Sequence, residues 1–293
     1  MTASGIDMIA IAPRPGLTAR MADYARRHPT VVVGGGVLFL MALIAILAPW
    51  IANDPMKLTP INRLKPPGEV YWFGTDFLGR EVFARTIYGS RVSLIVGGSV
   101  AVVSVTIGLV IELVAGYVRW VDAVVMRIMD GIMAIPGVLF AIALISLAGA
   151  SLVNVIIAIT IPEIPRVVRL VRSVVLTIRE QPYVEAAISV GSPMHKILIR
   201  HILPNTFAPL IVQTTYVCAS AVVIEAILSF LGAGTPPEIP SWGNVMAEGR
   251  IYFQVAPWIL FFPGLLLAIT VLAVNILGDG LRDSLDPRIA RRM

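Results

Sequence analysis

The chain has 293 residues, of which 57% are hydrophobic and 14% are charged. Soluble domains carry roughly 25% charged residues, so this composition excludes an ordinary soluble protein and predicts an all-α polytopic membrane protein. The net charge of +5 is better explained by anionic lipid headgroups and a cytoplasmic partner than by nucleic acid, because the sequence has no nucleic-acid motif. The single Cys218 excludes disulfides and cysteine-rich metal sites.

Residues 1–30 are predicted to form a cytoplasmic N-terminal arm, because no signal-peptide cleavage pattern follows the first apolar run. A membrane span needs about 20 mainly apolar residues. The sequence predicts six such spans, at residues 31–48, 92–118, 131–148, 152–171, 207–231 and 255–277. The fourth contains Glu163 between two prolines and then three arginines, which a tilted helix could tolerate in a water-filled vestibule.

Four regions follow from these spans. They are the arm at residues 1–30, a first helix with an extracytoplasmic amphipathic loop at 31–91, a five-helix core at 92–278, and a cytoplasmic tail at 279–293. With both termini in the cytoplasm, 16 of the 23 Lys and Arg residues lie on that side. Basic residues in short loops favour the cytoplasm, so this orientation is the predicted one.

The loop after the first span ends in the segment WFGTDFLGREVFARTIYGSRVSLIVG, residues 72–97. Thr75 or Asp76 can cap a helix there. The apolar residues of that helix are expected to lie against the membrane or a partner, whereas its charged residues are expected to remain in water. The apolar residues are Val82, Phe83 and Ile87, and the charged residues are Arg80, Glu81 and Arg85.

A polar-edged insert lies between the fourth and fifth spans, and its core is EAAISVGSPMHKILIRHILPN, residues 185–205. Gln181-Pro182 predicts the start of a helix that Gly191 ends. Ser192-Pro193 predicts a second helix, capped by the serine hydroxyl and closed by Pro204. Two short helices joined at a glycine form a shape that can dock into a groove, and the alternative is a loop helix lying on the membrane surface.

This insert resembles the EAA loop of ABC importer permeases, at residues 182–205. The resemblance rests on residues that fill the fixed positions of that motif and that it assigns to ATPase coupling: Glu185, Ala186, Ala187, Gly191, His201, Pro204 and Asn205. The segment from Trp72 is similar to the F-G-T-D-x-x-G-R-D signature of the C-type permease subunit of dipeptide, oligopeptide and nickel ABC importers, with Glu81 in place of the final Asp. Further similar segments begin at Gly116, Glu225 and Leu277.

The resemblance implies a non-enzymatic permease subunit in the bacterial inner membrane that forms half of a pathway for short peptides. It implies a B-type permease, two cytoplasmic ABC ATPases and an extracytoplasmic solute-binding protein as partners. No cofactor is expected on this chain, with ATP and Mg bound by the ATPases. The residues agree, because none of the three lysines follows a glycine as a phosphate-binding loop requires. The three histidines match neither a zinc motif nor a catalytic triad, so no metal or catalytic residue is expected.

Carboxylates within predicted spans are candidates for the substrate pathway, because intramembrane charges are costly. Glu112 and Glu163 depart from the family pattern, and a structural role is favoured for both. Glu225 matches the family, and packing against the partner permease and lining the passage are both open for it. Asn154 and Asn275 are better explained by hydrogen bonds between helices. The predicted pathway residues are Glu225, Glu112 and Asn154.

Other classes of function stay open at this stage. A nickel or other small-solute importer would have the same motifs. An ion-gradient-driven secondary transporter would also carry intramembrane charges, but it leaves the insert unexplained and no inverted repeat is visible. A membrane-embedded hydrolase lacks a catalytic constellation.

Overall fold

The computed structural model describes residue 16 and residues 23–116 and 119–285. Within these ranges every regular element is helical, and one isolated β-bridge pairs Thr75 with Glu81. The all-α prediction is therefore confirmed. Most of the predicted N-terminal arm and residues 286–293 of the predicted tail lie outside the described residues.

Four helices are long and apolar enough to cross a membrane. They are α2 (Pro29–Ile51), α3 (Val82–Ala115), α9 (Leu203–Phe230) with the short helical segments before it, and α11 (Trp258–Leu285). They correspond to the first, second, fifth and sixth predicted spans. Three of them cross predicted region boundaries, because α2 begins at Pro29 within the predicted arm, α3 begins nine residues before residue 91, and α11 runs past residue 278.

The third predicted span is not one helix. Its residues 131–148 hold only the last three residues of α4 (Arg119–Met133) and the whole of α5 (Gly137–Ala148), and these two helices are bent by 83° relative to each other. Pro136 lies at the break and precedes the first residue of α5. Proline lacks a backbone N–H and disfavours a helical residue before it, which favours a break at this position. The pair counts as a fifth span if its halves cross together.

Helix α6 (Leu152–Arg179) occupies the fourth predicted span. Its 28 residues extend over about 42 Å at 1.5 Å per residue, more than the hydrocarbon thickness of about 30 Å. It is not among the helices that qualify as spans by composition, because its second half is rich in charge. Length and composition therefore support four or five spans, and α6 is the remaining helix of the six predicted.

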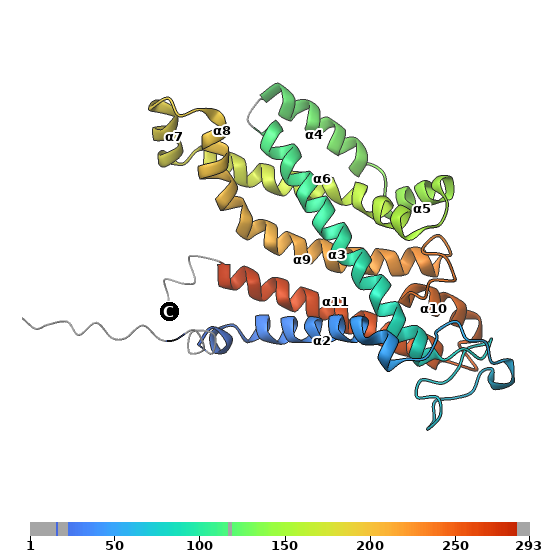
Figure 1. Ribbon diagram of the computed structural model, residues 1–293. Coiled ribbons are helices and arrows are strands. Elements are labelled where there is room, and N and C mark those ends of the chain that lie inside the picture. The colour runs from blue at the N-terminus through green and yellow to red at the C-terminus, as the bar shows by residue number, and fades with distance from the viewer. Residues whose placement is uncertain (1–15, 17–22, 117–118, 286–293) are drawn as a thin grey trace, which may run out of the picture.

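The two ends of the helix bundle differ (Figure 1). The insert, residues 181–205, lies at one end together with the start of α2 and the end of α11. The loop between α2 and α3, residues 52–81, lies at the opposite end with α10 (Trp242–Gly249). We call these the insert end and the loop end.

Small residues allow the helices to approach closely. A side chain on Gly97 of α3 would lie 2.6 Å from Val222 of α9, and one on Gly34 of α2 would lie 2.6 Å from the backbone of Leu277 in α11. Close backbone packing at glycine is the usual basis of helix association in lipid. Cys218 lies beside Gly97 and is partly buried, in keeping with a packing role.

Candidate functional site

The first helix of the insert, α7 (Pro182–Ser189), begins as the sequence predicts. Gln181 is its N-cap, and Pro182 occupies the first turn, where a missing N–H is tolerated. The C-terminus of α7 is closed by a Schellman motif. The Gly191 N–H donates to the Ile188 carbonyl at 2.9 Å, and the Ser192 N–H donates to the Ala187 carbonyl at 3.0 Å.

Gly191 has a φ of +79°, which side chains rarely adopt. A Cβ atom at this position would have no heavy atom within 4 Å. The elbow therefore requires glycine for its backbone conformation, and space around it is open within this chain. A larger side chain here would strain the backbone and project into open space.

The second helix of the insert differs from the prediction. Helix α8 (Met194–Ile197) has Pro193 as its N-cap and no side-chain capping bond, so the expected cap by Ser192 is not formed. Pro204 does not close this helix. The chain continues through a π-helical turn, η2 (Leu198–Ile202), directly into α9.

Proline explains the π-helical turn. Pro204 has no N–H to donate to the preceding turn, and the Leu203 N–H instead donates to the Leu198 carbonyl five residues earlier. The Asn205 side chain donates to the His201 carbonyl at 2.6 Å, which adds a hydrogen bond across this turn. The second half of the insert is therefore continuous with a membrane-spanning helix.

Both faces of the insert are defined by burial. Val184, Ile197 and Ile202 are buried in the main hydrophobic cluster of the bundle, which anchors both halves. The Tyr183 and His201 rings lie 5.9 Å apart and join the halves across the elbow. Apolar side chains remain exposed on the outer surface: Tyr183, Ile188, Val190 at 86% and Ile199 at 64%.

The predicted coupling residues lie together in this insert. Glu185 is exposed and faces a cavity of about 530 Å³ between α7 and the insert ends of α3, α4 and α6, which is lined also by Asp122, Arg172 and Arg179. Ala186 and Gly191 are exposed, and Pro204 and Asn205 line a second cavity of about 600 Å³ between α6, α9 and α11. The arrangement is an anchored element with a mostly exposed outer surface.

The predicted pathway residues are not brought together. Glu225 is fully buried near the loop end of α9, where it accepts hydrogen bonds from Ser229 at 2.8 Å and Ser93 of α3 at 3.2 Å. Asn154 lies at the first turn of α6 and donates to the carbonyls of Ala148, the last residue of α5, and of Gly149 after it. The expected hydrogen bond between helices is therefore formed, and it joins two helices that are consecutive in the chain.

Glu112 lies at the opposite end of α3 from Ser93 and is fully buried. Neither carboxylate oxygen has a hydrogen-bond partner among the described residues. Gly116 makes room for it, since a Cβ there would lie 2.6 Å from Oε1 of Glu112. Glu163 differs, because it forms an ion pair with Arg166 at 2.7 Å.

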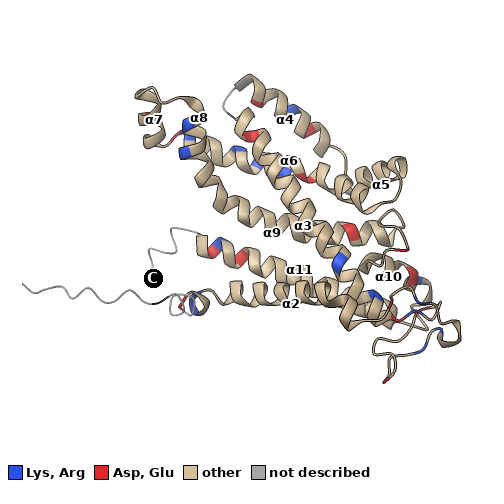
Figure 2. Ribbon diagram, viewed as in Figure 1, with Lys and Arg blue, Asp and Glu red and all other residues tan. Residues whose placement is uncertain are grey.

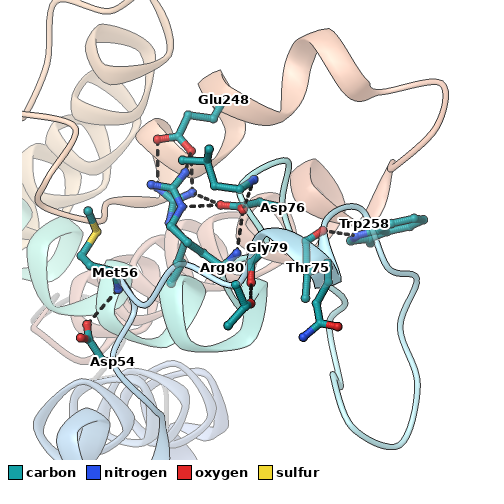
Figure 3. A network of polar contacts seen from close by, with 12 residues as sticks. Asp54, Met56, Thr75, Asp76, Gly79, Arg80, Glu248 and Trp258 are labelled. Carbon is teal, nitrogen blue, oxygen red and sulfur yellow. Dashed lines mark hydrogen bonds and ion pairs between the residues drawn. The ribbon is translucent and has the colours of Figure 1, made fainter.

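A cluster of charges at the loop end was not anticipated (Figure 3). Arg80 and Arg85 were expected in water but are buried, and this prediction is wrong. Arg85 donates to Glu248 of α10 at 2.6 and 3.0 Å and to Asp76 at 2.9 Å, and Arg80 donates to Asp76 at 2.7 Å and also to Glu248. Two positive and two negative charges compensate one another, which makes burial possible.

The backbone around this cluster is tightly constrained. The Asp76 carboxylate also accepts the N–H groups of Leu78 and Arg80 at 2.9 Å, so it closes the turn before α3. Gly79 has a φ of +74°, and a Cβ there would lie 1.9 Å from the Thr59 carbonyl oxygen. The cluster therefore fixes the loop of residues 52–81 onto α10. The four-residue spacing of Asp76 and Arg80 in the sequence indicates that these two residues can pair. Nothing in the sequence indicates the pairing of Arg85 with Glu248, because the two residues are 163 positions apart.

Residues 82–291 match the family described as the inner membrane component of binding-protein-dependent transport systems, and residues 17–67 match the N-terminal transmembrane domain of oligopeptide transport permease C. The chain belongs to this permease family. The matches cover the insert and α3, and of the loop-end cluster they include Arg85 and Glu248.

Several curated proteins are similar along nearly their whole length. A "probable peptide ABC transporter permease protein" of Sinorhizobium fredii is 56% identical, with 94% of each chain covered. A dipeptide transport system permease protein of Alkalihalophilus pseudofirmus is 41% identical, over 90% of this chain and 88% of its own. A glutathione transport system permease protein of Pectobacterium atrosepticum is 39% identical, over 91% and 89%.

Proposed function

We propose that the chain is the C-type permease subunit of an ATP-driven importer and forms half of the translocation pathway for short peptides. The relatives named for peptides, dipeptides and glutathione support this substrate class. Nickel or another small solute is the alternative, because the coupling and membrane parts would be the same. A gradient-driven transporter is disfavoured, since it leaves the insert without a role.

The observation that carries the proposal is the construction of the insert. Its inner residues are anchored in the bundle, its outer apolar residues are exposed, and it continues through η2 into α9. A displacement of the insert by a partner would therefore be transmitted to a membrane helix. Two-state movement of packed helices is the usual way in which such a displacement changes access to a pathway.

The proposal includes the partners that the family resemblance implies. The insert docks on one of two cytoplasmic ABC ATPases, a B-type permease completes the pathway, and an extracytoplasmic binding protein delivers the solute. ATP and Mg are bound by the ATPases, and this chain itself catalyses no reaction. The protein spans a bacterial inner membrane, and its insert end and both termini lie on the cytoplasmic side.

Docking is tested by placing a charge on the exposed apolar surface of the insert. Val190 is 86% exposed, so Val190→Asp should leave the fold intact and disrupt an apolar contact with the ATPase. The matched control is Ile61→Asp, which changes a residue that is 90% exposed at the loop end. The measurement is co-purification of the ATPases with the permease pair. Loss with Val190→Asp alone supports the proposal, and equal retention by both variants contradicts it.

A further inference from the structure

The exposed surface of α6 changes character along the helix. Near the loop end the exposed side chains are apolar, Val153 and Ile157. Toward the insert end they are mainly polar and fall on one stripe at helical spacing: Arg166, Arg169, Ser173 and Thr177, with Leu176 beside them. At about 100° per residue, Arg166 lies half a turn from Ile157, so the two surfaces are on opposite sides of the helix.

The arginines of this stripe lie within one membrane thickness of the loop end of α6. Arg166 and Arg169 follow Leu152 by 14 and 17 residues, which places them about 21 and 25 Å from the loop end of α6 at 1.5 Å per residue. A hydrocarbon core of about 30 Å includes both positions. Their side chains are nevertheless 46% and 45% exposed on the surface of this chain.

The charge of Arg166 and Arg169 is incompatible with a position that faces lipid. Helix α2 shows what a lipid-facing surface of this protein looks like, because its exposed large side chains are apolar throughout, including Val33, Phe39 and Ile46. Figure 2 shows the same contrast, with charged residues along α4 and α6 and none along the middle of α2. A charged side chain in lipid costs several kcal/mol, so charges in a span face protein or water.

Each arginine is paired, but only in part. Arg169 donates to Asp130 of α4 at 2.6 Å, and Asp130 is itself 55% exposed. Arg166 donates to the buried Glu163 at 2.7 Å. Each pair involves one of the five N–H groups that a guanidinium carries. The remaining N–H groups of each guanidinium form a planar fork, and this fork can donate hydrogen bonds to carboxylate and carbonyl oxygens.

We propose that the stripe of α6 formed by Arg166, Arg169 and Ser173, together with Asp130 of α4, lines the water-filled route of the solute, and that its guanidinium groups bond to the carboxylate and carbonyl oxygens of a passing peptide. This inference rests on the proposed function for the existence of a route and of a peptide. A contact with the partner permease is disfavoured, because the cores of protein interfaces are depleted of charge.

The first experiment measures whether the stripe is in water. In the assembled complex with Cys218→Ala, a cysteine replaces Arg169 while Asp130→Asn removes the charge that would be left unpaired. A membrane-impermeant, charged thiosulfonate is the probe. The control is Phe39→Cys on α2. The Phe39 side chain is 71% exposed and is expected to face lipid. Labelling at position 169 that changes between ATP-free and vanadate-trapped complexes is expected, with no labelling at position 39. Absence of labelling at position 169 in both states would overturn the inference.

The second experiment separates a contact with the solute from a structural ion pair. Arg169→Gln with Asp130→Asn is neutral, so a purely structural pair predicts normal peptide uptake per assembled complex. Loss of hydrogen bonds to a charged group predicts uptake lowered by about tenfold or more at saturating loaded binding protein. Normal uptake by the double variant would overturn the solute contact. Failure of the unmodified complex to take up peptide would instead contradict the proposed function.

Discussion

The loop-end cluster makes a quantitative prediction for Arg85→Met. Arg85 is fully buried and supplies three of the hydrogen bonds that join Asp76 to Glu248. Its removal leaves the buried Asp76 carboxylate and the partly exposed Glu248 carboxylate with Arg80 as their shared counter-ion. Breaking a buried pair by removing one partner costs about 3–5 kcal/mol. At about 2–4 °C per kcal/mol for a chain of this size, the melting temperature should fall by about 6–20 °C.

The assay is thermal melting of the detergent-purified complex, read by size-exclusion chromatography. The matched control is Arg27→Met, because Arg27 pairs with Asp23 at 2.9 Å while both side chains are more than half exposed. Exposed pairs contribute at most about 1 kcal/mol. Adding Glu248→Gln to Arg85→Met should recover part of the loss by restoring neutrality. Equal melting of Arg85→Met and Arg27→Met would refute the argument that this cluster fixes the loop.

Three further predictions concern topology and the buried carboxylates. Single cysteines at Asn62 and Ser189, made with Cys218→Ala, should label from opposite faces of the membrane, and labelling of both from outside intact cells would contradict the orientation. If Glu225 packs against the partner permease, Glu225→Ala should reduce assembly of the permease pair and Glu225→Gln should partly restore it. If Glu225 lines the pathway, Glu225→Gln should assemble normally and show altered transport. No effect of either variant on assembly, ATPase coupling or uptake excludes both roles. Glu112→Gln should melt at or above the wild-type temperature, because it removes a buried charge that lacks a hydrogen-bond partner in the described chain, and a marked decrease would show that the carboxylate has an ionic partner.

Local chemistry explains what the sequence could predict. Gln181-Pro182 and Gly191 determine where α7 begins and ends through a missing donor and a positive φ, and both are properties of single residues. Apolar runs of sufficient length likewise predicted α2, α3, α9 and α11. The insert, which is the main candidate site, was therefore recognisable before its geometry was known.

Contacts between distant segments could not be predicted in the same way. Arg85 looked like a surface residue because its partner Glu248 lies 163 residues away. Pro136 was visible, but whether a proline kinks a helix or breaks it by 83° depends on what packs around it. Pro204 was expected to end a helix, and the chain instead passed it through a π-helical turn.

The central claim is that the insert transmits the movement of an ATPase to the pathway, and the most direct test is the amount of solute taken up per ATP hydrolysed in proteoliposomes. Gly191→Asp is compared with Gly149→Asp, because both glycines have positive φ, +79° and +85°, and open space around the missing Cβ, whereas only Gly191 lies in the insert. Uptake per ATP should fall for Gly191→Asp, because the new charge lies at the elbow of the insert, and should remain normal for Gly149→Asp, which carries a similar backbone strain outside the insert. Equal uptake per ATP in the two variants would contradict the account.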